Sequence, residues 1–331
     1  MWTIGETMTR RMSFPALGVL VGMVLLFFVR CGFSSNPNEL LGCDNDKFPI
    51  ATNLSGSILA APTFSVFRST DNADSWTNVS SGLPQAAIWS LLLTPAGNAF
   101  AGAAGVLSRR TLGSDSWEIV LDSIANVLAL CVDSSGYLYA STEGAGFFRS
   151  TDNGTTWTKL IEGYQAQFWA IAARYDGQLF AGPPISRSTD HGETWAVANA
   201  GIENLGTQTL AIDAQGAVFV GTYGGVYRST NEGNNWTSIN QGLANLSVSS
   251  LAINRLGHVF AATTGGVFRS MNRGEAWVAV NNGLSDLSVR SIAVSVEDLL
   301  LASTLNHGVY NSANGGDTWV PANNGLKYCR D

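Results

Sequence analysis

The octet STDNGTTW, residues 150–157, decides the fold because close variants of it recur along the chain. The other copies are STDNADSW (69–76), the degraded RTLGSDSW (110–117), STDHGETW (188–195), STNEGNNW (229–236), SMNRGEAW (270–277) and SANGGDTW (312–319). The seven terminal tryptophans are 41, 40, 38, 41, 41 and 42 residues apart. A segment that recurs at a fixed period is an element of architecture and is rarely a unique catalytic loop.

One full period is readable from Val248 to Leu284, VSSLAINRLGHVFAATTGGVFRSMNRGEAWVAVNNGL. SLAIN predicts a first strand (A), HVFAAT a second (B), VFRS a third (C) and WVAV a fourth (D), each bounded by glycine or asparagine. Four short antiparallel strands per period, in seven periods, predict an all-β protein with a single seven-bladed β-propeller. One blade cannot bury both of its faces alone, so the blades must stack around a common axis.

Within this scheme the octet is the turn from strand C to strand D. Its third residue is Asp or Asn, whose side chain is expected to accept hydrogen bonds from backbone N–H groups two residues on. These residues are Asp71, Asp152, Asp190, Asn231, Asn272 and Asn314. The closing tryptophans are expected to anchor the blades in the core, and they are Trp76, Trp117, Trp157, Trp195, Trp236, Trp277 and Trp319. Because Asn replaces Asp in three copies, charge is dispensable there, and the sequence predicts no metal site and no cofactor.

The N-terminus differs from the rest of the chain. Arg10 and Arg11 precede the uncharged apolar run 14–29, which is typical of an export signal or of a membrane anchor. We therefore predict a signal peptide or anchor over 1–34, a linker over 35–46 and the propeller over 47–328. The protein is expected to be exported, as a secreted, periplasmic or cell-surface monomer that meets a membrane only through residues 14–29.

Composition restricts the class of partner. The 331 residues carry a net charge of −7, and only 13% of them are charged. No block of five or six basic residues is present to meet a phosphate backbone, so nucleic acid is not expected as a partner.

Strand direction separates two faces. The A–B turns and the octets share one face, the bottom, whereas the B–C loops and the D–A loops share the other, the top. Positions that vary between blades while facing the axis are candidates for function. Near the start of strand A these positions are Phe48, Trp89, Leu128, Trp169, Gln208, Ser249 and Arg290, and the B–C loops add Glu143, Tyr223 and His307.

Aromatic rings, one cation and a few polar groups around a concavity suit stacking on a sugar or anchoring a peptide. The predicted top-face site comprises Trp89, Trp169, Gln208, Arg290, Tyr223, Glu143 and His307. In the alternative interpretation, the two tryptophans only plug the channel.

The pattern S-x-D-x-G-x-T-W resembles the Asp-box, or BNR, repeat, and the GTTW and GETW copies match it fully. The resemblance covers about residues 47–326. The family includes sialidases, sortilin-type receptors, xyloglucanase-type glycoside hydrolases and proteins similar to photosystem II assembly factors. It implies a propeller, with any active site on the face opposite the octets, but it does not fix an activity.

The requirements for catalysis are poorly met. A sialidase-type site needs three arginines around one carboxylate, and only Arg290 is placed near the top of the axis. Arginines at the position eight residues before the octet tryptophan are repetitive and therefore structural: Arg68, Arg109, Arg149, Arg187, Arg228 and Arg269. The top-face acids are scattered singly: Asp122, Glu143, Glu162, Glu203 and Asp286. We therefore predict a non-enzymatic module that binds a protein or a glycan, and as an alternative a glycoside hydrolase with a top-face carboxylate pair.

The cysteines add a structural expectation. Cys131 lies in strand A of the third blade and is expected to be a buried thiol. Cys43 precedes the first blade and Cys329 follows the last. The two chain ends must meet where the ring closes, and an exported protein permits disulfides, so we predict a Cys43–Cys329 disulfide.

Overall fold

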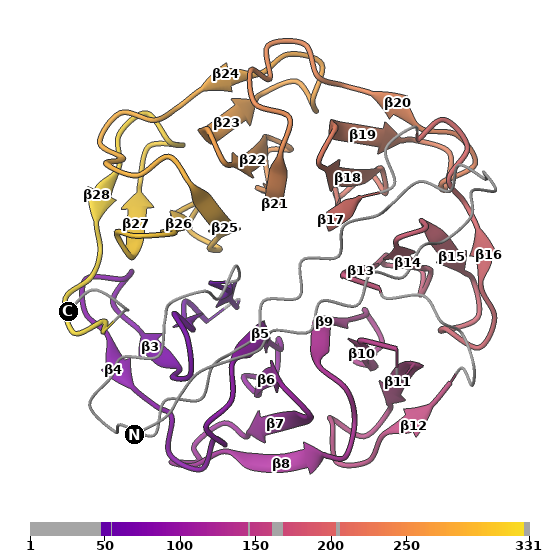
Figure 1. The fold of residues 1–331 in the computed structure, drawn as a ribbon, viewed down its shortest axis with the longest axis vertical. Coiled ribbons are helices and arrows are strands. Elements are labelled where there is room, and N and C mark those ends of the chain that lie inside the picture. The colour runs from indigo at the N-terminus through magenta and orange to yellow at the C-terminus, as the bar shows by residue number, and fades with distance from the viewer. Residues whose placement is uncertain (1–47, 54, 145, 161–167, 203–205, 328–331) are drawn as a thin grey trace, which may run out of the picture. The chain divides into compact units, whose positions relative to one another are not determined.

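The computed structural model describes residues 48–53, 55–144, 146–160, 168–202 and 206–327. These residues form seven sheets of four antiparallel strands, each built from four consecutive strands of the chain. The sheets stand as blades around a central axis (Figure 1), and the innermost strand of each blade contacts that of the next. The predicted all-β, seven-bladed propeller is therefore confirmed.

The strands follow the A-to-D order that the repeat predicts. Blades 1 to 3 comprise β1 (Ile50–Thr52), β2 (Ile58–Ala60), β3 (Phe67–Ser69), β4 (Thr77–Asn78); β5 (Ile88–Leu93), β6 (Ala99–Ala103), β7 (Val106–Arg110), β8 (Glu118–Leu121); and β9 (Val127–Val132), β10 (Leu138–Thr142), β11 (Gly146–Ser150), β12 (Thr158–Lys159). Blades 4 and 5 comprise β13 (Ala170–Ala173), β14 (Leu179–Gly182), β15 (Ser186–Ser188), β16 (Ala196–Val197); and β17 (Thr207–Ile212), β18 (Val218–Thr222), β19 (Gly225–Ser229), β20 (Thr237–Ser238). Blades 6 and 7 comprise β21 (Val248–Ile253), β22 (Val259–Thr263), β23 (Gly266–Ser270), β24 (Val278–Ala279); and β25 (Val289–Val294), β26 (Leu300–Thr304), β27 (Val309–Ser312), β28 (Val320–Pro321).

The core lies between blades. Every B strand is buried along its described length, whereas the D strands form the outer wall. The buried apolar residues form seven clusters, one at each junction between neighbouring blades. One cluster joins Phe48 and Phe67 of the first blade to Leu301 and Val309 of the last. Among the described residues, the ring therefore closes by packing of the first four-stranded blade against the last, and neither sheet includes a strand from the other end of the chain.

Hydrogen bonds within the octet hold the C–D turn. In six copies the first-position serine donates to the third-position Asp or Asn at 2.7–3.0 Å. That Asp or Asn also accepts a backbone N–H, but from the residue four positions on, at 2.9–3.0 Å. The expected spacing of two residues was therefore wrong, because the turn contains two successive left-handed residues, such as Asn153 and Gly154, and spans a longer arc. Hydrogen bonds from the side chain and the backbone of Thr156, and from Ser150, lower the pKa of Asp152 to about 2.

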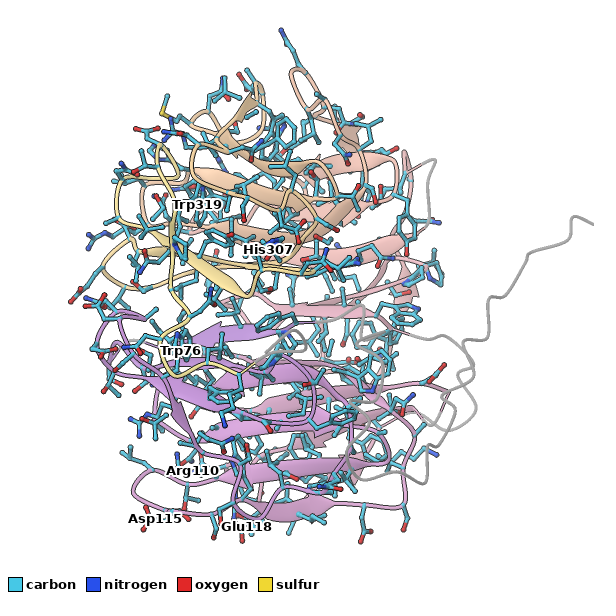
Figure 2. The ribbon with its side chains drawn as sticks, turned by 60° about the vertical axis from the view of Figure 1, so that its left-hand side comes forward. Trp76, Arg110, Asp115, Glu118, His307 and Trp319 are labelled. Atoms are coloured by element: carbon cyan, nitrogen blue, oxygen red, sulfur yellow. The ribbon has the colours of Figure 1, made fainter. Side chains whose placement is uncertain are left out.

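Five octet tryptophans extend into the preceding blade; we call them reaching tryptophans. They are 3–5% exposed, and their indole N–H groups donate to a backbone carbonyl of that blade at 2.6–2.8 Å. The five are Trp76, Trp117, Trp236, Trp277 and Trp319, of which Figure 2 labels Trp76 and Trp319 at the closure of the ring. The other two, Trp157 and Trp195, donate to a carbonyl of their own octet at 3.2 and 3.0 Å and are partly exposed; we call them in-blade tryptophans.

The repeated arginines also join neighbouring blades. In five blades the strand-C arginine donates to the carbonyl of the fourth octet residue of the next blade at 2.7–3.1 Å. In three of these five junctions the side chain of that fourth residue also pairs with the A–B turn of the blade before it. These pairs are His191 with Asp133, Glu232 with Arg174, and Arg273 with Asp213. The arginines are thus structural, and the contacts place the octets and the A–B turns on one face.

The predictions about the cysteines and the N-terminal segment are tested only in part by the described residues. Cys43, Cys329 and the segment 1–46 lie outside the described residues, so the disulfide and the export signal stay predictions. Cys131 lies in β9 as a partly buried free thiol, and burial raises its pKa. Within the part of the chain that the structure describes, no helix is long and apolar enough to cross a membrane.

Candidate functional site

The innermost strands carry a β-bulge near their top ends. In five blades the pairing of strand A with strand B skips one residue. The skipped residues are Trp89, Leu128, Gln208, Ser249 and Arg290. These are five of the seven positions that comparison of the repeats selected. A bulge turns a side chain away from the regular alternation of its strand, and here it turns the variable position of each blade toward the axis.

All seven selected positions line one cavity at the upper end of the channel. It has a volume of about 220 Å³ and includes Phe48 and Trp169, which lie just before the regular part of strand A, together with the five bulged residues. The sequence prediction that these positions face a common space is met by their geometry.

The polar groups in this upper cavity differ in how far they are engaged. Ser249 Oγ donates to Val289 O at 2.7 Å and so ties blade 6 to blade 7. Gln208 Nε2 makes only long contacts, at 3.4 Å, with the carbonyls of Gly206 and Thr207. The indole Nε1 of Trp89 is buried and has no hydrogen-bond partner among the described residues. A buried N–H group that lacks a partner is destabilising until something accepts its hydrogen bond.

The B–C loop residues lie outside the lining of the upper cavity. Tyr223 is 61% exposed. Glu143 accepts a hydrogen bond from Asn126 Nδ2 at 2.7 Å. His307 lies 3.6 Å from Asp286, measured from Nδ1 to Oδ2. B–C loops connect strands that are not innermost, so these three side chains belong to the top-face rim and are not brought together with Trp89 or Arg290.

Two of the described top-face acids, Glu143 and Asp286, accept local hydrogen bonds. Burial favours the neutral form of Asp286, but hydrogen bonds from the backbone of Ser288 and Asn306, together with the nearby His307, outweigh it, so its pKa is lowered. None of Asp122, Glu143 and Asp286 lines the upper cavity. Glu162 and Glu203 lie outside the described residues. Among the described residues, no group of three or more His, Cys, Asp or Glu is placed to hold a metal ion.

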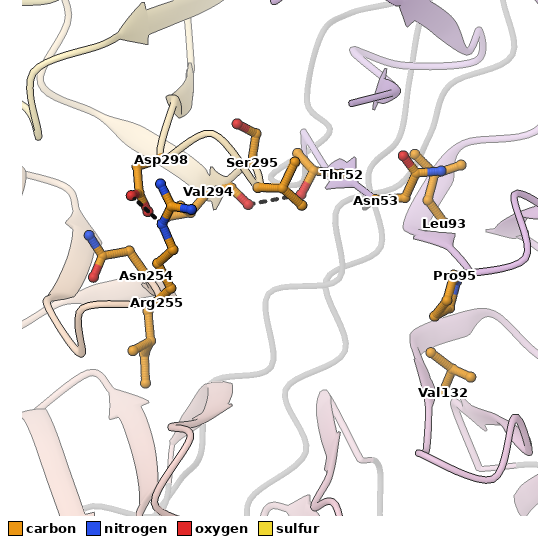
Figure 3. Close-up of a pocket in the computed structure, with 12 residues that line it drawn as sticks. Thr52, Asn53, Leu93, Pro95, Val132, Asn254, Arg255, Val294, Ser295 and Asp298 are labelled. Atoms are coloured by element: carbon orange, nitrogen blue, oxygen red, sulfur yellow. Dashed lines mark hydrogen bonds and ion pairs between the residues drawn. The ribbon is translucent and has the colours of Figure 1, made fainter. Parts of the chain in front are cut away.

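A second cavity lies at the bottom mouth of the channel, and the sequence analysis did not anticipate it. It has a volume of about 480 Å³ and is lined by the ends of the A strands and by the A–B turns. Figure 3 shows Leu93, Pro95 and Val132 on one side and the Arg255–Asp298 ion pair, 2.8 Å long, on the other. The last residue of strand A is apolar in six blades, and this repetition was the signal that could have predicted the cavity.

Comparisons with known proteins agree with this architecture. No family model matches the chain, and no curated protein matches its sequence. Among solved structures, the GH74 enzyme of Niastella koreensis has 17% sequence identity to this chain and a TM-score of 0.69, with 84% of this chain covering 54% of the enzyme. This chain thus spans about half the length of that enzyme.

Two further solved structures have a similar architecture, and one of them holds a bound peptide. The WD40 propeller domain of Doa1 shares 13% identity at a TM-score of 0.66, over 84% of this chain and 96% of that domain. YCF48 bound to D1 peptide shares 14% identity at a TM-score of 0.61, over 77% of this chain and 88% of that one. Likeness at these identities establishes the propeller fold, and the fold occurs in both enzymes and binding proteins.

Proposed function

We propose that this protein is an exported, non-enzymatic binding module of the Asp-box type. Its ligand, a protein or a glycan, docks on the top face and inserts a group into the upper cavity between Trp89, Trp169 and Arg290. The observation that carries the proposal is the convergence of seven variable side chains on one cavity, five of them turned there by bulges. A bulge repeated at a position whose side chain varies in chemistry indicates selection for what that side chain contacts.

The composition of the cavity supports this role. Two indole rings provide flat apolar surfaces for stacking, the guanidinium of Arg290 provides a cation, and the buried Nε1 of Trp89 provides a donor that awaits an acceptor. These groups recognise the carbonyl or hydroxyl oxygens of a peptide or a sugar. The glycosidase alternative is supported less well, because the described top-face acids lie outside the cavity and are already hydrogen-bonded or single.

Binding to arrays of glycans and of peptides tests the proposal. The double variant Trp89→Ala with Trp169→Ala is expected to lose at least tenfold in affinity for any ligand that the wild-type protein selects. Leu256→Ala is the matched control, because Leu256 is 69% exposed on an A–B turn of the bottom face. Equal binding by the double variant and the wild-type protein would reject the upper cavity as the site.

Tyr223→Ala separates the cavity from the rim. Tyr223 lies on the top face but does not line the cavity. A loss with Tyr223→Ala that exceeds the loss with the tryptophan pair would move the ligand to the rim of blades 5 to 7. Turnover of aryl glycosides by the double variant would favour the enzyme alternative.

A further inference from the structure

Blade 2 departs from its six sister blades at the octet. In those six blades the first octet residue is a serine that is at most 2% exposed: Ser69, Ser150, Ser188, Ser229, Ser270 and Ser312. Blade 2 has Arg110 at that position (Figure 2) and Leu112 where the Asp or Asn would stand. Leu112 is 68% exposed and cannot accept the hydrogen bonds that hold the other turns. The degraded octet of blade 2, residues 110–117, has therefore lost the motif and has also gained a cation and an exposed apolar side chain.

A small cavity lies at this place, between blades 1 and 2 on the bottom face. Its volume is about 30 Å³. A single water needs roughly 10–15 Å³, so the space suffices for about two waters. Arg68 and Arg110 both line it, with the polar side chains of Asn53, Ser57 and Thr111. None of its twelve lining residues is an aspartate or a glutamate.

No described carboxylate forms an ion pair with either guanidinium group. Among the described residues, the side chain of Arg110 makes no hydrogen bond or ion pair, and its Nε is buried. Arg68 Nη2 donates to Ser57 Oγ at 3.0 Å and has no carboxylate within ion-pair distance in the described chain. The equivalent arginines of the next five blades each have a carboxylate within 4.0 Å.

Arg68 lacks the carboxylate partner of the equivalent arginines because the octet of the next blade is degraded. Arg68 faces blade 2, whose octet has Leu112 in place of the Asp or Asn that holds the turn in the other blades. The sixth octet residue of blade 2 is still an acid, Asp115, but among the described residues it forms no ion pair with Arg68, unlike the acids at that position in blades 4, 6 and 7. Two partly buried cations that line one small cavity repel each other and lose hydration, which is costly unless a counter-charge joins them. The chain as a whole has a net charge of −7, so this pair is not part of a generally basic surface.

We propose that this cleft binds a tetrahedral oxyanion, phosphate or sulfate, between Arg68 and Arg110. The planar guanidinium presents parallel N–H groups that match the edge of such an ion, and two of them match its double charge. The hydroxyl of Thr111 adds a donor at the rim. The bound anion replaces the interblade contact that blade 2 lost with its octet, and it can be either a free ion or the charged end of a phosphate or sulfate ester.

Thermal unfolding and calorimetric titration at constant ionic strength test the proposal. The probes are inorganic phosphate, inorganic sulfate, a phosphorylated monosaccharide and a sulfated monosaccharide, with chloride and acetate as controls. Phosphate or sulfate, free or esterified, is expected to raise Tm by several degrees more than chloride or acetate, because a ligand that binds only the folded state stabilises it. Tighter binding of the free ions identifies an enclosed ion site, and tighter binding of the esters identifies a site for the end group of a larger molecule.

Arg110→Ser is the decisive variant because it restores the residue that six sister blades already have. It is expected to bind phosphate and sulfate at least tenfold more weakly, and Arg110→Gln serves if Arg110→Ser does not fold. Arg255→Gln is the matched control, since Arg255 is an exposed bottom-face arginine with its own acid partner. Equal stabilisation by acetate or chloride, or unchanged affinity in both Arg110 variants, would overturn the proposal. The Trp89 and Trp169 variants should leave oxyanion binding intact, so this test is independent of the top-face function.

Discussion

The reaching and the in-blade tryptophans end nearly the same octet, yet they stabilise the ring differently. At Trp277 the indole crosses to the preceding blade and donates to Ile239 O at 2.6 Å. At Trp195 the indole stays above its own turn, donates to Gly192 O and packs on Phe147 and Phe168, with ring centroids 5.2 and 5.4 Å away. The octet therefore specifies the turn, but it does not specify which blade provides the hydrogen-bond acceptor for the indole of its tryptophan.

The loop at the end of the preceding blade determines whether the indole donates its hydrogen bond to that blade. In the blade that precedes each reaching tryptophan, one residue of this loop accepts the tryptophan's backbone N–H, and the next residue is a glycine with positive φ. The five glycines are Gly82, Gly201, Gly242, Gly283 and Gly325. A Cβ on any of them would overlap the carbonyl oxygen of the tryptophan. The loop between β8 and β9 has no such glycine. There the indole N–H of Trp157 donates within its own octet, while its ring meets Phe100 of blade 2 edge-on, with ring centroids 6.3 Å apart.

The largest loss of stability is expected when the glycine in the loop before a reaching tryptophan is replaced. Gly283→Ala places a Cβ against Trp319 O at φ +95°, so we expect a loss of about 3 kcal/mol or more from the left-handed conformation and the overlap together. Gly257→Ala is the matched control: its φ is +78° and nothing lies within 4 Å of the added Cβ. It should lose only about 1–2 kcal/mol. Urea unfolding measures both, and similar losses would mean that the contact with Trp319 contributes nothing.

A smaller effect is expected at the tryptophans themselves. Trp277→Phe removes a buried donor and leaves Ile239 O without it, which should cost about 2 kcal/mol. Trp195→Phe removes a hydrogen bond inside a partly exposed turn and keeps an aromatic ring against Phe147, so about 1 kcal/mol is expected. The two variants are compared by their denaturation midpoints at equal slope. A larger loss for Trp195→Phe would show that aromatic packing, and not the interblade hydrogen bond, is the stronger anchor.

The sequence alone predicted the features that repeat. The seven blades, their strand order and the bottom position of the octets follow from local patterns of about five residues each. The positions that line the upper cavity were also predictable, because repeats align one blade with the next and expose the places where Trp89 or Arg290 breaks the pattern.

What the sequence analysis missed depends on contacts between blades. The Trp277 indole and its acceptor are 38 residues apart, and the octet holds no sign of that partner. The bulges arise from pairing between strands A and B and leave no local signature. Tyr223, Glu143 and His307 were assigned to the site because their loops share the top face, but a shared face does not set the distance from the axis. Arg110 was treated as part of a worn copy, although its chemistry differs from that of a lost serine.

The smallest expected effect concerns the part that both kinds of junction share, the octet turn. Hydrogen bonds from Thr156 and Ser150 lower the pKa of Asp152 to about 2 from its ordinary 3.8. A group whose pKa is lower in the folded state adds stability that is present above about pH 4 and is lost as the pH falls toward 2. Asp152→Asn keeps an acceptor oxygen for the turn but has no carboxylate, so it should be slightly less stable than the wild-type protein at neutral pH and lose less stability than it does between about pH 4 and pH 2.

The reverse substitution, Asn314→Asp in blade 7, tests the same dependence of stability on pH. Asn314 occupies the same position in blade 7, accepts the backbone N–H of Thr318 at 3.0 Å and donates Nδ2 to the Thr318 hydroxyl at 2.9 Å. In Asn314→Asp the hydroxyl can turn and donate to the carboxylate, as Thr156 does to Asp152 at 2.6 Å. The variant should then gain the acid dependence that Asp152→Asn loses, as read from urea midpoints across that pH range. If neither variant changes the dependence on pH, the carboxylates of the octets do not couple to folding, and the exchange of Asp for Asn among blades is neutral for that reason.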